Sequence, residues 1–335
     1  MSTNTPLSIE EASHDRPLLT LAIATSTIMM CVMAFAVVAR ITAKAFVVKK
    51  IHLEDYALMF ALVGVAAWMS LYLATRDYGL GLHIEDVPVE DLSQFLYLCN
   101  VAEIIYGPVI FAAKWSVLLQ QRRIFAPTKT GVVYWTINIL TYMTLAFYLA
   151  ITFSFIFQCW PREAIWNLRV KGTCIDAIPA TFSCGVINLL SDTATLALPL
   201  WAIWHLQMPI KRKLPVYAIF GAGLFVCVMG STGVAYRAQL LHSIDFTYIS
   251  TQVGLWTLAE FCAVIVVGCM PSMPQFFRFV TGKTNASTTN AYHYTANDLK
   301  RPFAKNSKDR ANDTYVDPEV ARHEVSGQYL QLEEH

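Results

Sequence analysis

The chain has 335 residues, of which 55% are hydrophobic and only 15% are charged, and its formal net charge is +1. A soluble domain of this length carries roughly a quarter charged residues, and nucleic-acid-binding proteins are markedly basic. The composition therefore excludes an ordinary soluble domain and indicates no nucleic-acid partner. It indicates a protein that lies in the lipid bilayer.

Seven apolar stretches predict seven membrane-spanning helices. A bilayer core about 30 Å thick needs about 20 apolar residues at 1.5 Å rise per residue. The stretches are Leu18–Ala39, Tyr56–Thr75, Phe95–Leu119, Val132–Phe157, Thr181–Trp204, Leu214–Leu241 and Tyr248–Met270. The first is too long for the apolar region of a signal peptide, so we expect it to be retained. The predicted fold is an all-α seven-transmembrane helix bundle in a multi-pass membrane protein of the plasma membrane or an endomembrane.

The distribution of Lys and Arg predicts the orientation, because these residues concentrate in cytoplasmic loops. Most lie after the odd-numbered stretches: Arg40, Lys44, Lys49, Lys50, Arg122, Arg123, Lys129, Lys211, Arg212, Lys213, Arg278 and Lys283. We therefore expect a short extracellular or lumenal N-terminus (1–17), a transmembrane domain (18–278) and a cytoplasmic tail (279–335). The tail is polar and reads as disordered.

Two cysteines fall in the predicted outer loop between the fourth and fifth stretches, where an oxidising compartment favours disulfides. They are Cys159 and Cys174, and we predict a bond between them. The alternative joins one of them to Cys99, near the outer end of the third stretch.

Five charged residues fall within the predicted helices, namely Glu103, Lys114, Asp192, Arg237 and Glu260. A charge facing lipid near the bilayer centre costs about 2.5–3.5 kcal/mol on insertion scales, so some of them must face the interior of the bundle. We expect Arg237 to form a structural ion pair with Glu103 or Glu260. Lys114 lies near the predicted cytoplasmic end of its helix, and we expect its amine to extend toward the interface.

The polar residues of these helices form a candidate ligand-binding site: Glu103, Tyr106, Asn188, Asp192 and Glu260. Asn188 and Asp192 are four residues apart and share a helix face. The alternative is a structural network that fixes how the helices pack. No sequence pattern indicates a metal or a cofactor, and no catalytic residue is identified, so the sequence leaves open whether the protein is an enzyme.

Several motifs resemble the fungal rhodopsin-domain family of integral membrane proteins. They include Leu53-Glu54-Asp55-Tyr56, Tyr78-Gly79-Leu80-Gly81, Lys114-Trp115-Ser116, Gln158-Cys159-Trp160-Pro161 and Cys269-Met270-Pro271. The resemblance covers about Pro17 to Arg278. The family includes receptor-like pathogenesis proteins and the satratoxin-cluster type. The last predicted helix contains no lysine, so a Schiff base has no attachment point and we expect no retinal.

This resemblance implies a membrane-embedded or accessory component of a mycotoxin-type secondary-metabolite pathway, which handles a small apolar molecule or pathway intermediate alongside pathway enzymes. The short, cysteine-free N-terminal segment favours this reading over the receptor reading. One alternative is a receptor-like sensor that couples to a cytoplasmic signalling protein. The second is a transporter, although the sequence shows no internal repeat.

Overall fold

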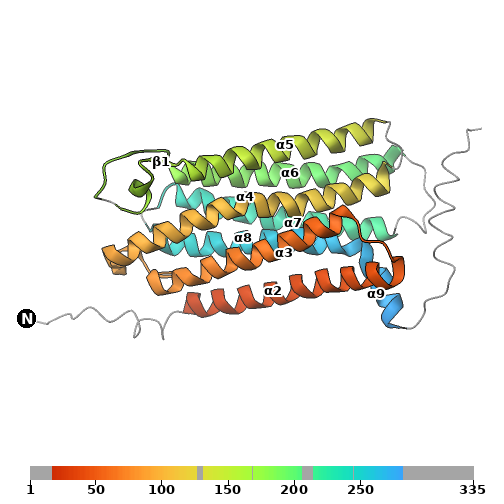
Figure 1. Ribbon diagram of the computed structural model, residues 1–335, viewed down its shortest axis with the longest axis horizontal. Coiled ribbons are helices and arrows are strands. Elements are labelled where there is room, and N and C mark those ends of the chain that lie inside the picture. Colours follow the sequence, from red (N-terminus) through yellow and green to blue (C-terminus); the bar gives the residue numbers. More distant parts are fainter. Residues whose placement is uncertain (1–16, 127–130, 168, 206–213, 244, 282–335) are drawn as a thin grey trace, which may run out of the picture. The chain divides into compact units, whose positions relative to one another are not determined.

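The computed structural model describes residues 17–126, 131–167, 169–205, 214–243 and 245–281, and long helices dominate it (Figure 1). The helices are α2 (Pro17–Thr42), α3 (Leu53–Ala74), α4 (Val89–Phe125), α5 (Val132–Ile156), α6 (Ala177–His205), α7 (Leu214–Leu240), α8 (Phe246–Cys269) and α9 (Met273–Val280). A π-helical turn, Ala43–Val48, continues α2, and 3₁₀ turns lie at Thr75–Tyr78, Ile84–Asp86, Arg162–Ile165 and Met270–Ser272. The predicted N-terminal segment, apart from Pro17, and nearly all of the predicted disordered tail lie outside the described residues.

Six helices of the described residues are long and apolar enough to cross a bilayer: α2 with its π-helical continuation, α3, α4, α5, α6 and α8. The chain is therefore an all-α, multi-pass membrane protein, as its composition predicted. The remaining predicted span coincides with α7, a helix of 27 residues. Its crossing of the bilayer remains a prediction.

Helix α8 lies at the centre of the packing. Of its most apolar 18-residue window 67% is buried, compared with 22% of the corresponding window of α5. It contacts α2, α3, α4 and α7, while α4 also contacts α3, α5 and α6. The shared apolar core includes Leu58, Val65, Ile110, Leu258, Phe261 and Ile265. Because α4 and α8 touch most of the other helices, polar residues on these two helices can meet partners from several directions.

The first predicted span ended too early. Helix α2 and its π-helical turn run on to Val48, so Arg40 and Lys44 are not loop residues. Arg40 is 0% exposed and Lys44 is 8% exposed, and Glu54 and Asp55 are buried beside them in the first turn of α3. The five charges predicted within the helices were thus an undercount. A hydropathy criterion ends a helix at the first cation, whereas a cation paired with a carboxylate is compatible with burial.

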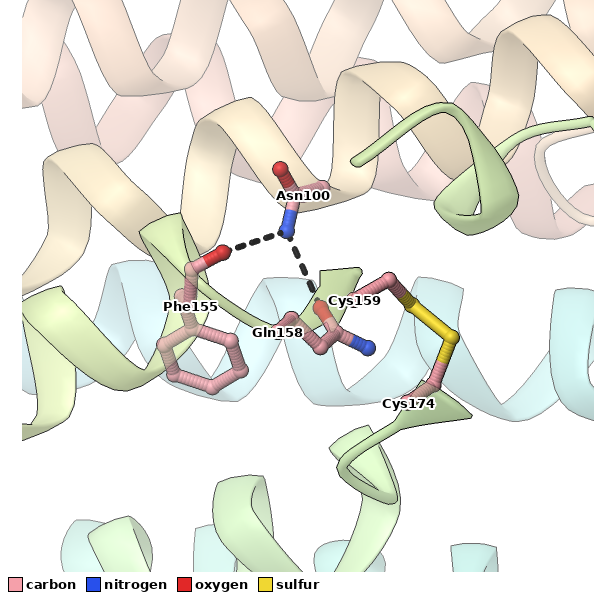
Figure 2. The surroundings of a disulfide bond; sticks show 5 residues. All are labelled: Asn100, Phe155, Gln158, Cys159 and Cys174. Carbon is pink, nitrogen blue, oxygen red and sulfur yellow. Dashed lines mark hydrogen bonds between the residues drawn. A yellow bond between two sulfur atoms is a disulfide. The ribbon is translucent and has the colours of Figure 1, made fainter. Parts of the chain in front are cut away.

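The loop after α5 contains the only two strands of the described residues, β1 (Cys159–Trp160) and β2 (Thr173–Cys174), which pair antiparallel with Cys159 opposite Cys174. These two cysteines form a disulfide (Figure 2). Cys99 is free. We call this end of the helices the disulfide-loop end. The opposite end, where α2 finishes and α9 lies, is called the α9 end (Figure 1).

Asn100 of α4 fixes the start of this loop. Its Nδ2 donates hydrogen bonds to the Phe155 carbonyl at 3.1 Å and to Gln158 Oε1 at 3.0 Å (Figure 2). The Phe155 carbonyl belongs to the last turn of α5 and lacks an intrahelical partner. A side chain of α4 therefore satisfies the end of α5 and holds the disulfide loop against the helices.

Replacing Cys159 and Cys174 together by serine should lower the thermal unfolding temperature in detergent without removing the protein from the membrane fraction. The bond closes a loop with a sequence separation of 15 residues, and a loop of this length is worth about 3 kcal/mol in the chain-entropy model. Cys99→Ser is the matched control and should leave the unfolding temperature unchanged. An unchanged unfolding temperature in the double variant would show that the loop is held by its other contacts.

Candidate functional site

A cavity of about 160 Å³ lies between the helices at the disulfide-loop end. Its wall comes from α3 to α8 and from the disulfide loop. Most of the wall is apolar, including Trp68, Phe95, Phe155, Ile178, Phe246 and Val253. Among the described residues, Glu103 and Arg237 are the only charged ones that line it. Pockets for drug-sized ligands measure about 300–1,000 Å³. The cavity therefore suits a small apolar molecule, or one end of a larger one.

Glu103 and Tyr106, one turn apart on α4, place polar atoms at this cavity. Among the described residues, no Lys or Arg nitrogen lies within 4.0 Å of the Glu103 carboxylate, and the neighbouring hydrogen-bonding group is the hydroxyl of Thr181 on α6. Tyr106 is 3% exposed, and its hydroxyl has no hydrogen-bond partner in the described part of the chain. The cavity thus holds a carboxylate without an ion pair and a hydroxyl without a partner.

Beside the cavity, Arg237 of α7 forms an ion pair with Glu260 of α8. Arg237 Nη1 lies 2.8 Å from Glu260 Oε1, and Nη2 bonds Glu260 Oε2 at 3.3 Å and Thr257 Oγ1 at 2.9 Å. Two glycines make room for it. A Cβ on Gly233 would lie 2.5 Å from Glu260 Oε1, and one on Gly185 would lie 2.8 Å from Arg237 Cδ. Side chains at either position would push the pair apart.

The pair continues into a hydrogen-bonded network through Asn188 of α6. Asn188 Nδ2 donates to Glu260 Oε2 at 3.2 Å, and its Oδ1 accepts from the Tyr148 hydroxyl at 2.7 Å. The Asn188 carbonyl accepts from Lys114 Nζ at 3.1 Å, and Lys114 Nζ lies 2.8 Å from Asp192 Oδ1. Five helices, α4 to α8, therefore contribute to one polar network.

The expectation that Lys114 reaches the membrane interface is wrong. Its side chain is 3% exposed and lies over the Tyr148 ring, 5.8 Å from the centroid. The carboxylate of Asp192 lies within reach on the neighbouring helix α6, and pairing there removes the need for the lysine to reach water.

The candidate ligand-binding residues thus fall into two groups. Glu103 and Tyr106 line the cavity, whereas Asn188, Asp192 and Glu260 belong to the network beside it and do not line it. Arg237 belongs to both, because it lines the cavity and pairs with Glu260. Binding through these residues remains a prediction.

A second cluster of buried charges lies toward the α9 end, and sequence reasoning missed it. Arg40 Nε lies 2.8 Å from Asp55 Oδ1, and Lys44 Nζ lies 2.8 Å from Asp55 Oδ1 and 2.9 Å from Glu54 Oε1. Arg123 of α4 completes it, with Nη1 at 2.8 Å from Glu54 Oε1. We call Arg40, Lys44, Glu54, Asp55 and Arg123 the α9-end cluster.

Further hydrogen bonds join this cluster to α4 and α8. Arg40 Nη1 donates to Gln120 Oε1 of α4 at 2.7 Å and to the carbonyl of Gly268 of α8. Ser116 of α4 donates to the Glu54 carbonyl at 2.7 Å. The α9-end cluster therefore ties α2, α3, α4 and α8 together, and α4 and α8 carry residues of both polar networks.

The part of the chain that contains both polar networks also matches a known protein family. The fungal rhodopsin domain matches residues 39–279, most of the chain. The chain belongs to the fungal rhodopsin domain family. The resemblance inferred from its motifs is therefore confirmed, and both polar networks lie within the fungal rhodopsin domain. No solved structure matches the chain.

Several relatives of this fungal rhodopsin domain protein carry descriptive names. A "SAT4 family membrane protein" of Emericella nidulans is 38% identical over 206 residues, 62% of this chain and 52% of the relative. The "Fugralins biosynthesis cluster protein 2" of Gibberella zeae is 25% identical over 74% of this chain and 66% of its own. The "Wortmanamides biosynthesis cluster protein C" of Talaromyces wortmannii is 23% identical over 76% and 68%. The chain thus spans about half of the length of the first relative and 66% of the length of the second.

The sequence does contain a signal for the α9-end cluster. Arg40 and Lys44 are four residues apart and so share a helix face, and the adjacent acids Glu54 and Asp55 follow a short connection. His52, Glu54 and Asp55 also lie close enough together to hold a metal ion. The carboxylates of Glu54 and Asp55 already pair with the three cations of the cluster. Burial and the nearby Arg123 lower the pKa of His52. This chemistry favours an ion-pair cluster over a metal site.

Asp55→Asn should destabilise the protein strongly, because it leaves Arg40 and Lys44 short of a buried counter-charge. Breaking a buried pair costs about 3–5 kcal/mol in soluble proteins. Asp77→Asn is the matched control, since Asp77 pairs with Arg76 on the surface with its side chain 66% exposed, and such pairs contribute about 0–1 kcal/mol. Thermal unfolding of both variants in detergent measures the difference. Equal unfolding temperatures would contradict a stabilising role for the cluster.

Proposed function

We propose that this protein is a membrane-embedded component of a secondary-metabolite pathway and that it binds a small apolar molecule in the cavity at the disulfide-loop end. The observation that carries this proposal is the cavity, which is largely apolar and lies among spanning helices. It contains the Glu103 carboxylate, which forms no ion pair with the described residues, and the Tyr106 hydroxyl, which has no hydrogen-bond partner among them. Apolar pockets with a few convergent polar groups are typical of small-molecule sites. The names of two relatives, both biosynthesis cluster proteins, support the pathway.

A receptor-like sensor is the second candidate, and one observation favours it. Helices α4 and α8 carry cavity residues such as Glu103 and Val253. The same two helices contact Arg40 of the α9-end cluster through Gln120 and Gly268. A ligand that displaced either helix would therefore act on contacts at both ends. Coupling between the two ends would require these helices to have two arrangements that a ligand can bias.

Filling the cavity should separate the two candidates. Ala102 lines the cavity, so Ala102→Phe should block it, whereas Ala146→Phe adds the same side chain to an exposed position on α5. In the native host, the pathway proposal expects the Ala102 variant alone to lose product while transcript levels of the pathway genes stay constant. The sensor proposal expects those transcript levels to change. Unchanged product and transcripts in a variant that remains in the membrane would contradict both.

We further propose that the chain crosses the bilayer seven times, with the disulfide-loop end outside. Helix α7 packs against the spanning helices α6 and α8, its 27 residues extend about 40 Å at 1.5 Å each, and Arg237 is its only charged residue. The disulfide favours an oxidising compartment. At the other end, the short amphipathic α9 exposes Phe277, Phe279 and Val280, which suits the membrane interface.

Reporter fusions test this topology. A fusion after His205 should read cytoplasmic and one after His242 should read outside or lumenal, because α7 lies between them. The same location for both would exclude a crossing by α7. The N-glycosylation acceptor patterns at Asn285 and Asn312 lie outside the described residues and should stay unglycosylated. A glycan attached to either asparagine would show that the proposed orientation is wrong.

A further inference from the structure

We propose that the otherwise apolar molecule bound in the cavity carries one protonated amine and that Glu103 is its counter-charge. This inference rests on the proposed function and specifies the class of ligand. It comes from the balance of charges around the cavity and from the hydrogen-bonding atoms that the cavity leaves without partners.

The charges of the network next to the cavity do not balance. Lys114 is committed to Asp192, with 2.8 Å between Nζ and Oδ1, and Arg237 is committed to Glu260, with 2.8 Å between Nη1 and Oε1. Glu103 is a third carboxylate beside these two pairs. The described residues supply no third cation within ion-pair distance of it. An isolated carboxylate is costly in a medium of low dielectric constant. Protonation removes that cost in the empty cavity, and a cationic ligand removes it while the carboxylate stays charged.

The unpartnered atoms beside Glu103 are hydrogen-bond acceptors or can act as acceptors. The Tyr106 hydroxyl and Asn100 Oδ1 are buried, line the same cavity and have no hydrogen-bond partner in the described part of the chain. In Figure 2 the Asn100 oxygen points away from Phe155 and Gln158, which accept hydrogen bonds from its amide nitrogen. The free atom of Asn100 is therefore its oxygen.

These residues follow one another along α4. Asn100, Glu103 and Tyr106 are spaced three apart, so each is the neighbour of the next on the helix surface. A primary ammonium group offers three N–H donors and no acceptor. Glu103 supplies the negative charge for such a group, and Asn100 Oδ1 and the Tyr106 hydroxyl are nearby acceptors on the same helix without partners in the described part of the chain.

The same geometry argues against an anionic ligand. In the described part of the chain, Arg237 is the only cation that lines the cavity, and its Nη atoms already bond Glu260 and Thr257. An anion would therefore meet the Glu103 carboxylate with no free cation among the described lining residues. A neutral alcohol could use the Tyr106 hydroxyl, but it would leave the charge of Glu103 unbalanced.

Binding of three matched probes to the full-length protein tests the inference. We would reconstitute it in nanodiscs of phosphatidylcholine and phosphatidylglycerol, which lack primary amines, and follow binding by ligand-observed NMR against empty nanodiscs. The probes are phenethylamine, phenethyl alcohol and hydrocinnamate, which share an aromatic ring and differ in charge. We expect the amine to bind best and hydrocinnamate not to bind. Competition by added phosphatidylethanolamine would assign the amine to a lipid headgroup, and its absence to a soluble metabolite.

Variants assign the effect to the cavity. Glu103→Gln should weaken amine binding about tenfold or more, since it removes a charge-assisted hydrogen bond. Tyr106→Phe should weaken it less, by about threefold to tenfold. Glu90→Gln, an exposed position at the start of the same helix, is the matched control and should bind as the wild type does. Because the probe comparison uses the unaltered protein, it stays informative even if the Glu103 variant is unstable.

The outcomes distinguish this inference from the proposed function. Equal binding of the amine and the alcohol, unaffected by Glu103→Gln but lost in Ala102→Phe, would overturn the amine and keep a small-molecule cavity. Binding of hydrocinnamate in preference to the amine would overturn the assignment of Glu103 as a counter-charge. No binding of any probe, together with normal product from the Ala102 variant, would overturn both.

Discussion

Charges buried among membrane-spanning helices need counter-charges, and the described part of this protein is arranged around that requirement. The bilayer provides no water to solvate an ammonium, guanidinium or carboxylate group. Lys114 with Asp192 and Arg237 with Glu260 meet the requirement within the helices, and the α9-end cluster meets it with five residues from three helices. Since each pair joins residues of different helices, satisfying the charges also fixes which helix faces meet.

The pairing needs close approach of the helices, and small residues allow it. Gly233 and Gly185 leave the volume that Arg237 and Glu260 occupy, since a Cβ at either position would fall within 3 Å of that pair. Hydrophobic packing alone does not drive association of helices in lipid, so packing by small residues and polar contacts between helices carry more of the specificity. The network and the glycines therefore act together in fixing how α6, α7 and α8 pack.

Glu103 is the exception that gives the cavity its chemical character. It lies one turn from Tyr106 on α4, in an otherwise apolar wall, while the neighbouring carboxylates are all paired. Residues that depart from the pattern of their surroundings in this way are frequent at functional sites. Helices α4 and α8 connect this cavity to the α9-end cluster.

The sequence by itself determined the all-α membrane class, the approximate position of every long helix, the family and the cysteines of the disulfide, because apolar length, loop position and local motifs are properties of neighbouring residues. It also placed Glu103 and Tyr106 among the candidate residues, both of which line the cavity. It did not determine that Lys114 meets Asp192, that Arg40 and Lys44 are buried, or that Asn188 links two ion pairs. Helical periodicity gives the face on which a residue lies but not the helix that packs against this face. Only the tertiary structure brings residues such as Arg40 and Gly268, 228 positions apart, into contact, and so decides which charges are satisfied and which one remains.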